Sequence, residues 1–269
     1  MVPTISVVIP VKDDATGLRT CLEALRGQTL SPDEIVVVDN GSRDGSPVVA
    51  QHFGCRVIAH PAGGIPAASA AGYDAATGDI VARIDADCVP DPHWLENVVA
   101  ALERRPDVAA VTGGAVFADG PRLLRRPLAA LYLGSYFFVL TPTLGHVPIF
   151  GSNFAMRRSA WRVVTGEVHR ADSLVHDDLD LAFHLGRGHR IVFDPSLGMA
   201  ISLRPLTDPG SYVLRARRGF HTVILHWPRE FPPFRWLRIL RRNRLTWSGR
   251  GAAPVRSDAS ARAGRSTNQ

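Results

Sequence analysis

The sequence predicts an α/β protein in which a doubly wound sheet carries functional groups along one edge. Three observations predict this class: short apolar runs typical of strands buried on both faces, helical segments between them, and acidic residues directly after several runs. The 269 residues, 45% of them hydrophobic and 21% charged, suffice for a large domain with a substantial core. This composition excludes a collagen-like, coiled-coil or largely disordered chain.

Strands and helices alternate through the first part of the chain. Apolar, β-branched runs predict buried strands at residues 5–11, 35–38, 56–59 and 80–84. Helices are predicted after Thr16, which can cap the first of them, and over residues 47–53 and 66–76. In such a sheet, ligands bind outside the carboxyl ends of the strands.

The alternation continues more loosely in the second part. A helix is predicted over residues 94–103, where a proline precedes the first turn, and another over 177–185. Further strands are expected at residues 108–117, 151–156 and 191–193. Residues 119–146 give no clear element.

Cysteine usage and hydropathy indicate the compartment. The three cysteines lie 34 and 33 residues apart, which argues against a zinc knuckle, a redox pair or a disulfide framework. The N-terminal apolar run turns acidic after Lys12, too soon for a signal peptide. The apolar stretch 128–140 ends at Thr141-Pro142, short of the roughly 18 residues that a membrane span needs. We therefore expect a cytoplasmic protein.

Positive charge is concentrated near the C-terminus. Residues 204–269 hold 14 arginines and three acidic residues, a local net charge of +11, whereas residues 1–203 carry −5. Tryptophan and arginine mixed over residues 227–247 suit peripheral contact with the inner face of the plasma membrane. A helix packed on the main domain with solvated arginines explains the segment equally. No nucleic-acid-binding motif accompanies the charge, so no nucleic-acid partner is expected.

Two aspartates, Asp85 and Asp87, follow the apolar run 80–84 with one residue between them. At a strand end both carboxylates can reach one hard cation, and oxygen ligands suit Mg²⁺ or Mn²⁺. Such an ion would neutralise a diphosphate and stabilise its departure. Spaced aspartates also occur in solvated turns, so the pair alone leaves a metal site and a plain turn open.

A third carboxylate, Asp39, follows the strand 35–38 and precedes a glycine-rich turn. It can accept a hydrogen bond from a base or a ribose hydroxyl, or it can close an Asx turn without any ligand. A dinucleotide-dependent dehydrogenase is disfavoured, because the loop after the first strand is acidic at Asp13 and Asp14 where Gly-x-Gly-x-x-Gly is needed. No Walker lysine motif or nucleophile elbow is present.

Four motifs occur in a characteristic order. They are residues 5–10, residues 38–46, residues 76–79 with the following strand to Asp85-Ala86-Asp87, and residues 177–181. Over about residues 4–220 their order and spacing resemble family 2 glycosyltransferases of the A-type fold. The resemblance implies a single Rossmann-like nucleotide-diphospho-sugar transferase domain with a mixed, mainly parallel central sheet. A helical, basic C-terminal extension follows it.

The resemblance also implies roles for individual residues. The donor-binding residues would be Pro10, Asp14, Asp39, Asp85 and Arg218. Asp87 would hold the Mn²⁺ or Mg²⁺ cofactor. Asp178 would be the general base, since an inverting transfer needs a carboxylate to take the proton of the acceptor hydroxyl.

Other roles concern the acceptor and the metal. Asp177 and Asn153 would bind the acceptor. A β-bulge or turn at Gly151 would explain the segment around Asn153 as well, without any ligand. His221 either binds the metal through its imidazole or has a purely structural role. An apolar loop over residues 123–149 either covers an amphipathic acceptor or packs in the core.

The sequence thus predicts a metal-dependent, inverting glycosyltransferase. It would move a sugar from a nucleoside diphosphate sugar, UDP-sugar first, to a glycan or lipid-linked acceptor in cell-surface glycan or glycolipid assembly. A nucleotidyltransferase acting on a sugar phosphate and a non-catalytic nucleotide- or membrane-binding relative are the alternatives. The expected organisation is a domain over 1–220 (donor half 1–118, acceptor half 119–220), an extension over 221–248, and a disordered tail over 249–269.

Overall fold

A seven-stranded sheet forms the centre of the protein, which a computed structural model describes for residues 2–60, 64–207, 209–227 and 229–248. The strand order is β3-β2-β1-β4-β8-β6-β9. The strands are β1 (Ile5–Val11), β2 (Glu34–Asp39), β3 (Arg56–Ala59), β4 (Ile80–Arg83), β6 (Val108–Thr112), β8 (Phe154–Arg157) and β9 (Arg190–Phe193). Strand β8 is antiparallel to both of its neighbours, and the other pairs are parallel. The predicted mixed, mainly parallel sheet is confirmed.

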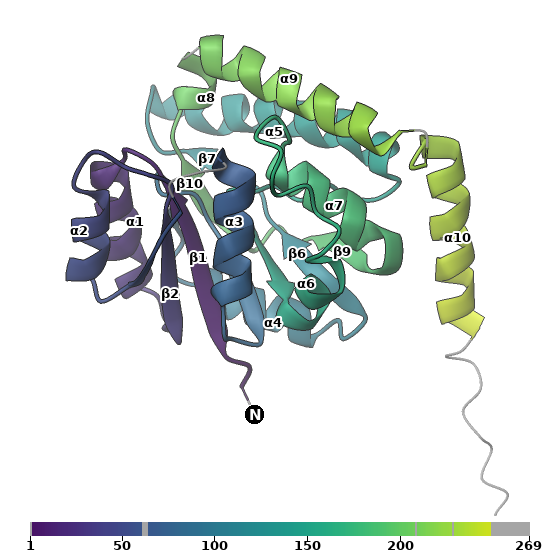
Figure 1. Cartoon of the computed structure of the whole chain (residues 1–269), viewed down its shortest axis with the longest axis horizontal. Coiled ribbons are helices and arrows are strands. Elements are labelled where there is room, and N and C mark those ends of the chain that lie inside the picture. The colour runs from purple at the N-terminus through teal and green to yellow at the C-terminus, as the bar shows by residue number, and fades with distance from the viewer. Residues whose placement is uncertain (1, 61–63, 208, 228, 249–269) are drawn as a thin grey trace, which may run out of the picture.

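Helices cover both faces of this sheet. One core cluster packs the sheet against α1 (Ala15–Arg26), α2 (Ser46–His52) and α4 (Trp94–Glu103). The other packs it against α3 (Gly64–Ala75), α6 (Arg158–Val164) and α7 (Asp177–Gly188). Helix α3 lies very close to the sheet at Gly72, where a Cβ atom would come 3.0 Å from a methyl of Val38. Figure 1 shows this layered arrangement.

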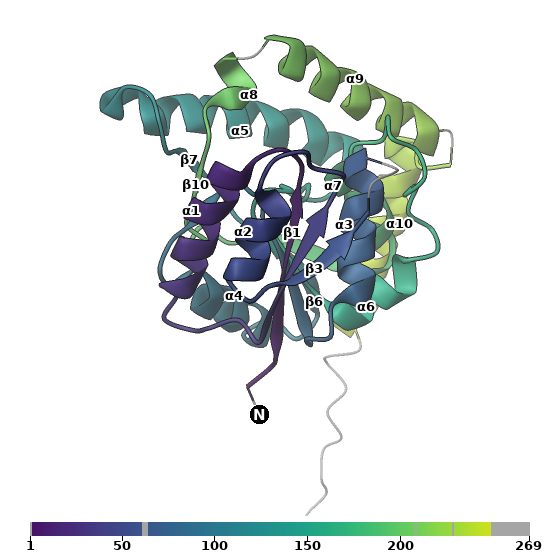
Figure 2. The same cartoon turned by 60° about the vertical axis from the view of Figure 1, so that its left-hand side comes forward.

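Further helices lie across the end of the sheet to which β1 runs. These are α5 (Arg122–Leu144), α8 (Arg204–Thr207) and α9 (Pro209–His226). Both views place them above the central sheet, opposite the N-terminus (Figures 1 and 2). Helix α10 (Pro232–Ser248) packs against α5 and α7. The carboxyl ends of the parallel strands therefore face a helical cover.

Several predicted elements are observed with only small shifts, but the strand expected over residues 108–117 is wrong. It is divided into β6 and β7 (Val116–Phe117), which belong to different sheets. Strand β7 joins β10 (Met199–Ile201) and β5 (Val89–Pro90) in a three-stranded sheet. The chain turns at Gly113, where a Cβ atom would lie 2.6 Å from that of Leu197. A residue with a side chain would not fit there.

Helix α5 was not predicted. It continues for 23 residues despite Pro127 and Pro142 and ends at Gly145, whose φ of 72° is left-handed. The expectation that the apolar run breaks at Thr141-Pro142 is therefore wrong. By length and composition α5 is the one helix in the described residues that qualifies as a membrane span, and 17% of its most apolar window is buried.

Two other expectations concern helix ends. The cap of α1 is Asp14, whose Oδ1 accepts a hydrogen bond of 3.1 Å from the backbone of Gly17, and Thr16 lies inside the helix. The boundary predicted at residue 220 falls inside the continuous helix α9. The division into domains stays a prediction, and the predicted tail 249–269 lies outside the described residues.

Candidate functional site

Acidic side chains that follow two different strands meet at the carboxyl edge of the sheet. Asp14 follows β1 and Asp87 follows β4, and both accept hydrogen bonds from one guanidinium nitrogen, Arg204 Nη2. The distances are 2.5 Å to Asp14 Oδ2 and 2.7 Å to Asp87 Oδ2. The predicted convergence is thus observed for these two carboxylates. Arg204 was missed, because in sequence it is one of many arginines in the basic segment.

Asp39 occupies the adjacent corner. It pairs in register with Val11 at the end of β1, next to Pro10. Its Oδ1 accepts a 3.0 Å hydrogen bond from the backbone N–H of Ser42. This bond closes a turn to the third residue on, whereas the Asx turn considered as an alternative joins residues two apart. A carboxylate has further acceptor capacity, so the turn positions Asp39 without preventing contact with a nucleoside.

The second aspartate of the Asp85-Ala86-Asp87 motif is suited to a cation. Burial and the neighbouring charge of Asp85 raise the pKa of Asp87. Ligand atoms of Asp85, Asp87 and Cys88 lie within 4.8 Å of one another. Burial raises the pKa of the Cys88 thiol far above its usual range, so the two carboxylates are the available hard ligands. Mn²⁺ or Mg²⁺ fits this pair, because either ion relieves the repulsion between the carboxylates.

A buried arginine connects the donor side with the predicted base. Arg83 is 4% exposed and its Nη2 lies 2.8 Å from Asp85 Oδ1 and 3.5 Å from Asp177 Oδ2. Burial opposes its charge, but these carboxylates outweigh burial and raise the pKa of Arg83. The sequence did not lead us to predict Arg83 as a site residue. A charged residue inside the otherwise apolar run 80–84 could have indicated it. Its charge ties two distant motifs into one ion network.

Asp178 is the second residue of α7 and is buried beside Arg83. Its Oδ2 accepts a 2.7 Å hydrogen bond from the backbone N–H of Gly151, and its Oδ1 contacts Nδ1 of His176. Burial alone would raise the pKa of Asp178, but the charges of His176 and Arg83 outweigh burial and lower it. The carboxylate is therefore ionised at neutral pH, as a proton acceptor must be.

Asp177, the neighbour of the predicted base, faces the same region. Its Oδ2 accepts a 2.8 Å hydrogen bond from the Ser69 hydroxyl. It is less deeply buried than Asp178, as expected for a group that contacts an incoming molecule. Its predicted role in acceptor binding stays a proposal.

Asn153 does not fit its predicted role. It is fully buried, and Oδ1 accepts a 2.8 Å bond from the Trp94 indole. Its Nδ2 donates 2.8 Å bonds to the carbonyls of Gly114 and Leu197. The side chain thus fastens the turn after β6 to the core, and this conformation leaves it inaccessible to an acceptor.

Two predicted residues lie on α9. The Nε of Arg218 is buried and has no hydrogen-bond partner among the described residues. An anion would reach it only after the side chain moves, and the predicted phosphate contact stays a proposal. His221 Nε2 lies 2.8 Å from Asp172 Oδ2. His221 thus has a carboxylate partner away from Asp87 and is absent from the clusters of candidate metal ligands in the described chain.

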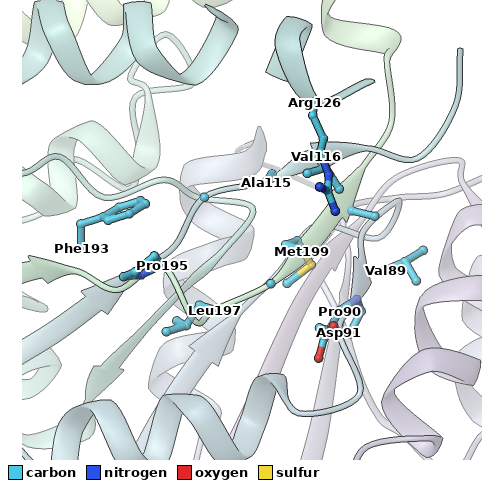
Figure 3. Close-up of a pocket in the computed structure, with 13 residues that line it drawn as sticks. Val89, Pro90, Asp91, Ala115, Val116, Arg126, Phe193, Pro195, Leu197 and Met199 are labelled. Carbon is cyan, nitrogen blue, oxygen red and sulfur yellow. The ribbon is translucent and has the colours of Figure 1, made fainter. Parts of the chain in front are cut away.

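A mostly apolar cavity of about 540 Å³ lies beside the three-stranded sheet. Its lining includes Val89, Phe193 and Met199, with Arg126 of α5 projecting into it from above (Figure 3). None of the predicted site residues lines it. Strand β5, which begins two residues after Asp87, connects the cavity to the acidic edge.

Comparison with known proteins agrees with this arrangement. The model of glycosyl transferase family 2 matches residues 6–164. The pre-mycofactocin glycosyltransferase of Mycobacterium tuberculosis is 33% identical over 204 residues, which are 71% of this chain and 41% of that protein. The chain thus spans about two fifths of the length of such relatives.

Solved structures share the fold. Glucosyl-3-phosphoglycerate synthase from Mycobacterium tuberculosis, in complex with Mn²⁺, UDP and glucosyl-3-phosphoglycerate, has a TM-score of 0.58 and 25% identity, with 83% of this chain and 79% of that chain covered. A Pyrobaculum calidifontis mannosyltransferase in complex with GDP-mannose and Mn²⁺ has a TM-score of 0.63 at 19% identity, with 95% and 77% covered. Fold and site define an α/β protein of the A-type glycosyltransferase class. The chain belongs to glycosyl transferase family 2.

Proposed function

We propose that this protein transfers a sugar, with inversion, from a nucleoside diphosphate sugar to a hydroxyl acceptor. The observation that carries the proposal is the ion network through Arg83, which joins Asp85 of the donor-side motif to Asp177 beside the predicted base. Donor and acceptor chemistry require carboxylates in one pocket, and a buried guanidinium keeps these carboxylates close together. UDP-sugar is the first donor to test, since the similar synthase was crystallised with UDP.

On the donor side, each group has a distinct task. Pro10 and Asp39, at the ends of the paired strands β1 and β2, would line the nucleoside corner with Asp14, and Asp85 would contact the ribose. Asp87 would hold Mn²⁺ or Mg²⁺, which supplies charge neutralisation at the diphosphate when it is bound. Arg218 would add a bidentate contact for a phosphate once its buried, unpartnered Nε becomes accessible.

On the acceptor side, Asp178 takes the proton. An ionised, buried carboxylate held by Gly151 N–H has a fixed orientation. As the acceptor oxygen attacks the anomeric carbon, its proton passes to Asp178 while the bond to the diphosphate breaks on the opposite face. Asp177 would orient the acceptor from the adjoining position.

A release assay tests the proposal. Full-length protein is incubated with Mn²⁺ and a panel of UDP- and GDP-sugars, and nucleoside diphosphate release is measured with and without added acceptors. Asp178→Asn should lower kcat by about 100-fold or more while donor affinity is retained. Asp172→Asn, an exposed carboxylate paired with His221, is the control and should stay within a few-fold. Release of pyrophosphate from nucleoside triphosphates would instead favour nucleotidyl transfer, and no metal-linked nucleotide binding would refute both enzymatic activities.

We further propose a cytoplasmic protein that contacts anionic membranes in cell-surface glycan or glycolipid assembly. Helix α10 and the turn before it expose large apolar side chains, namely Trp227, Phe231, Phe234, Trp236, Leu237 and Leu240. Arginines of α10 lie among them, and a basic, apolar surface suits an anionic bilayer. The apolar helix α5, of which only a small part is fully buried, and the cavity below Arg126 would serve a lipid-linked acceptor.

Vesicle flotation tests the membrane contact. Each basic residue near an anionic surface adds roughly 1 kcal/mol, so the intact protein should float with phosphatidylserine-containing vesicles and less with neutral ones. Phe234→Asp combined with Leu237→Asp should abolish flotation. Val48→Asp, an equally exposed apolar residue on α2, should not. Equal partitioning of both variants would refute the contact.

A further inference from the structure

A cluster of three histidines and one aspartate lies outside the proposed catalytic groups. Asp180 and His184 project from successive turns of α7, His226 ends α9, and His169 precedes α7. One ligand atom from each residue lies within 4.8 Å of the others. Asp180, His184 and His226 are buried, and His169 is 37% exposed at its side chain. The proposed glycosyl transfer uses none of them.

The spacing of the inward atoms matches tetrahedral coordination. Asp180 Oδ1 lies 3.5 Å from His184 Nε2 and 3.3 Å from His226 Nε2, and these two nitrogens are 3.4 Å apart. Zinc bonds of about 2.0–2.1 Å place neighbouring ligands of a tetrahedron roughly 3.3–3.4 Å apart. The three atoms therefore outline one face of such a tetrahedron. His169 Nδ1, 2.7 Å from Asp180 Oδ1, is placed to supply the fourth corner after a small outward shift.

The outer contacts fix which atoms face inward. His226 Nδ1 lies 2.8 Å from the carbonyl of Thr222, so it donates its proton there and leaves the lone pair of Nε2 inside. His184 Nδ1 faces the carboxylate of Glu167 at 3.3 Å, with the same result. Asp180 Oδ2 accepts a 2.8 Å bond from the backbone of His169, which turns Oδ1 inward. Metal-bound histidines in proteins typically have such outer partners.

These tautomers point the Nε2 lone pairs of His184 and His226 at each other without a hydrogen between them, and both face Asp180 Oδ1. The one hydrogen that reaches Oδ1 comes from His169 Nδ1. Lone pairs that converge in a buried space repel unless a cation or an added proton separates them. Arg235, the buried cation near this region, donates instead to Glu230 and to the carbonyls of Leu144 and Phe183. A metal ion satisfies all the inward atoms at once.

We propose that His169, Asp180, His184 and His226 bind one Zn²⁺ ion in a closed, structural site. Three imidazoles and one carboxylate favour zinc, whereas the carboxylates of Asp85 and Asp87 favour Mg²⁺ or Mn²⁺. The ion would tie the end of α9 to α7, the helix that carries Asp178 in its first turn. It would therefore hold helix α9, with its arginines, over the carboxyl ends of the parallel strands. This inference does not depend on the proposed function.

Metal content and spectroscopy of the full-length protein test the site. The purified protein is stripped with a chelator, dialysed against Zn²⁺ or Co²⁺ in excess Mn²⁺, and freed of unbound metal. We expect one zinc per chain, a higher Tm than the stripped protein, and the intense visible absorption of tetrahedral Co²⁺. Asp87→Asn should retain the zinc, which separates this site from the donor-side carboxylates. A folded wild-type protein that retains no zinc, or whose Co²⁺ form lacks tetrahedral absorption, would overturn the proposal.

Variants assign the ligands. His169→Ala, at the partly exposed corner, should remove the tetrahedral Co²⁺ spectrum. Glu167→Gln, which weakens the outer contact to His184 together with the ion pair to Arg187, should lower zinc affinity by about 10- to 100-fold. His93→Ala, an exposed histidine that pairs with Glu96, is the matched control and should bind zinc as the wild type does. Equal zinc affinity in His169→Ala and His93→Ala would overturn the assignment, and the wild-type measurements decide the proposal even where a variant misfolds.

Discussion

Arg204 donates a 2.7 Å hydrogen bond to Asp87, and the same nitrogen lies 2.5 Å from Asp14. A guanidinium thus lies where the first loop and the strand-end motif bring their carboxylates together. The side chain of Arg204 is 58% exposed, so solvent screens the pair and its contribution to stability is small. Its consequence is local, because Arg204 already neutralises Asp87, the carboxylate that would hold the proposed metal.

Replacement of Arg204 should therefore strengthen metal binding. Arg204→Ala removes a competing cation, so Mn²⁺ alone should bind up to about 10-fold more tightly, equivalent to roughly 1.4 kcal/mol. The free energy of unfolding should change by less than about 1 kcal/mol. Calorimetric titration measures the first quantity and denaturant unfolding the second.

Arg56→Ala is the matched control for this substitution. Arg56 is similarly exposed and lies 3.8 Å from Glu34, but it begins β3 and so lies at the opposite edge of the sheet. Its loss should leave Mn²⁺ affinity unchanged. If both variants bind Mn²⁺ as the wild type does, Arg204 does not compete with the metal.

The contact between His176 and Asp178 should set the acidic limb of the pH–rate profile. The charge of His176 contributes to lowering the pKa of Asp178, against the effect of burial. In His176→Gln that charge is lost and the pKa of Asp178 rises. The base must be ionised, so the acidic limb of kcat should move to higher pH. Steady-state rates across the acidic range measure the shift, and an unmoved limb would show that another group is the base.

Gly151 should tolerate no side chain. A Cβ atom there would lie 2.7 Å from Asp178 Oδ2 and even closer to Arg83 Nη1. Gly151→Ala should therefore displace the ion network, with a loss of about 1–3 kcal/mol in stability and a large fall in kcat. Gly166→Ala is the control, because nothing lies within 4 Å of its added methyl. Wild-type kcat and stability in Gly151→Ala would contradict the observed packing.

Stability should fall in acid partly through His146. Burial, together with the nearby charge of Arg235, lowers the pKa of His146 to about 4, whereas the unfolded chain retains the ordinary value of 6.5. Between these values the unfolded state binds more protons, so the free energy of unfolding decreases as the pH falls from about 6.5 to 4. His146→Gln keeps a neutral acceptor and should flatten this part of the curve. Equal slopes for the two proteins in urea unfolding would exclude His146 as a contributor.

The order of apolar, polar and acidic residues along the chain determined most of its helices and strands and the class of protein. The bounds predicted for β1, β3 and α4 are those observed, because burial on both faces and helical spacing are recorded locally in the residue types. The order and spacing of four motifs predicted the family through their resemblance to its members. Helix α5 was not predicted because two internal prolines, Pro127 and Pro142, interrupt its helical residue pattern.

Tertiary structure alone decided the partners of the side chains. Arg204 is 190 residues from Asp14, and Asn153 lies in the core because Trp94, 59 residues away, binds it. Likewise, four residues of the proposed zinc site come together only when α9 packs against α7. A hydrogen bond or ion pair depends on distances of a few ångströms between segments remote in sequence, and local residue patterns do not record those distances.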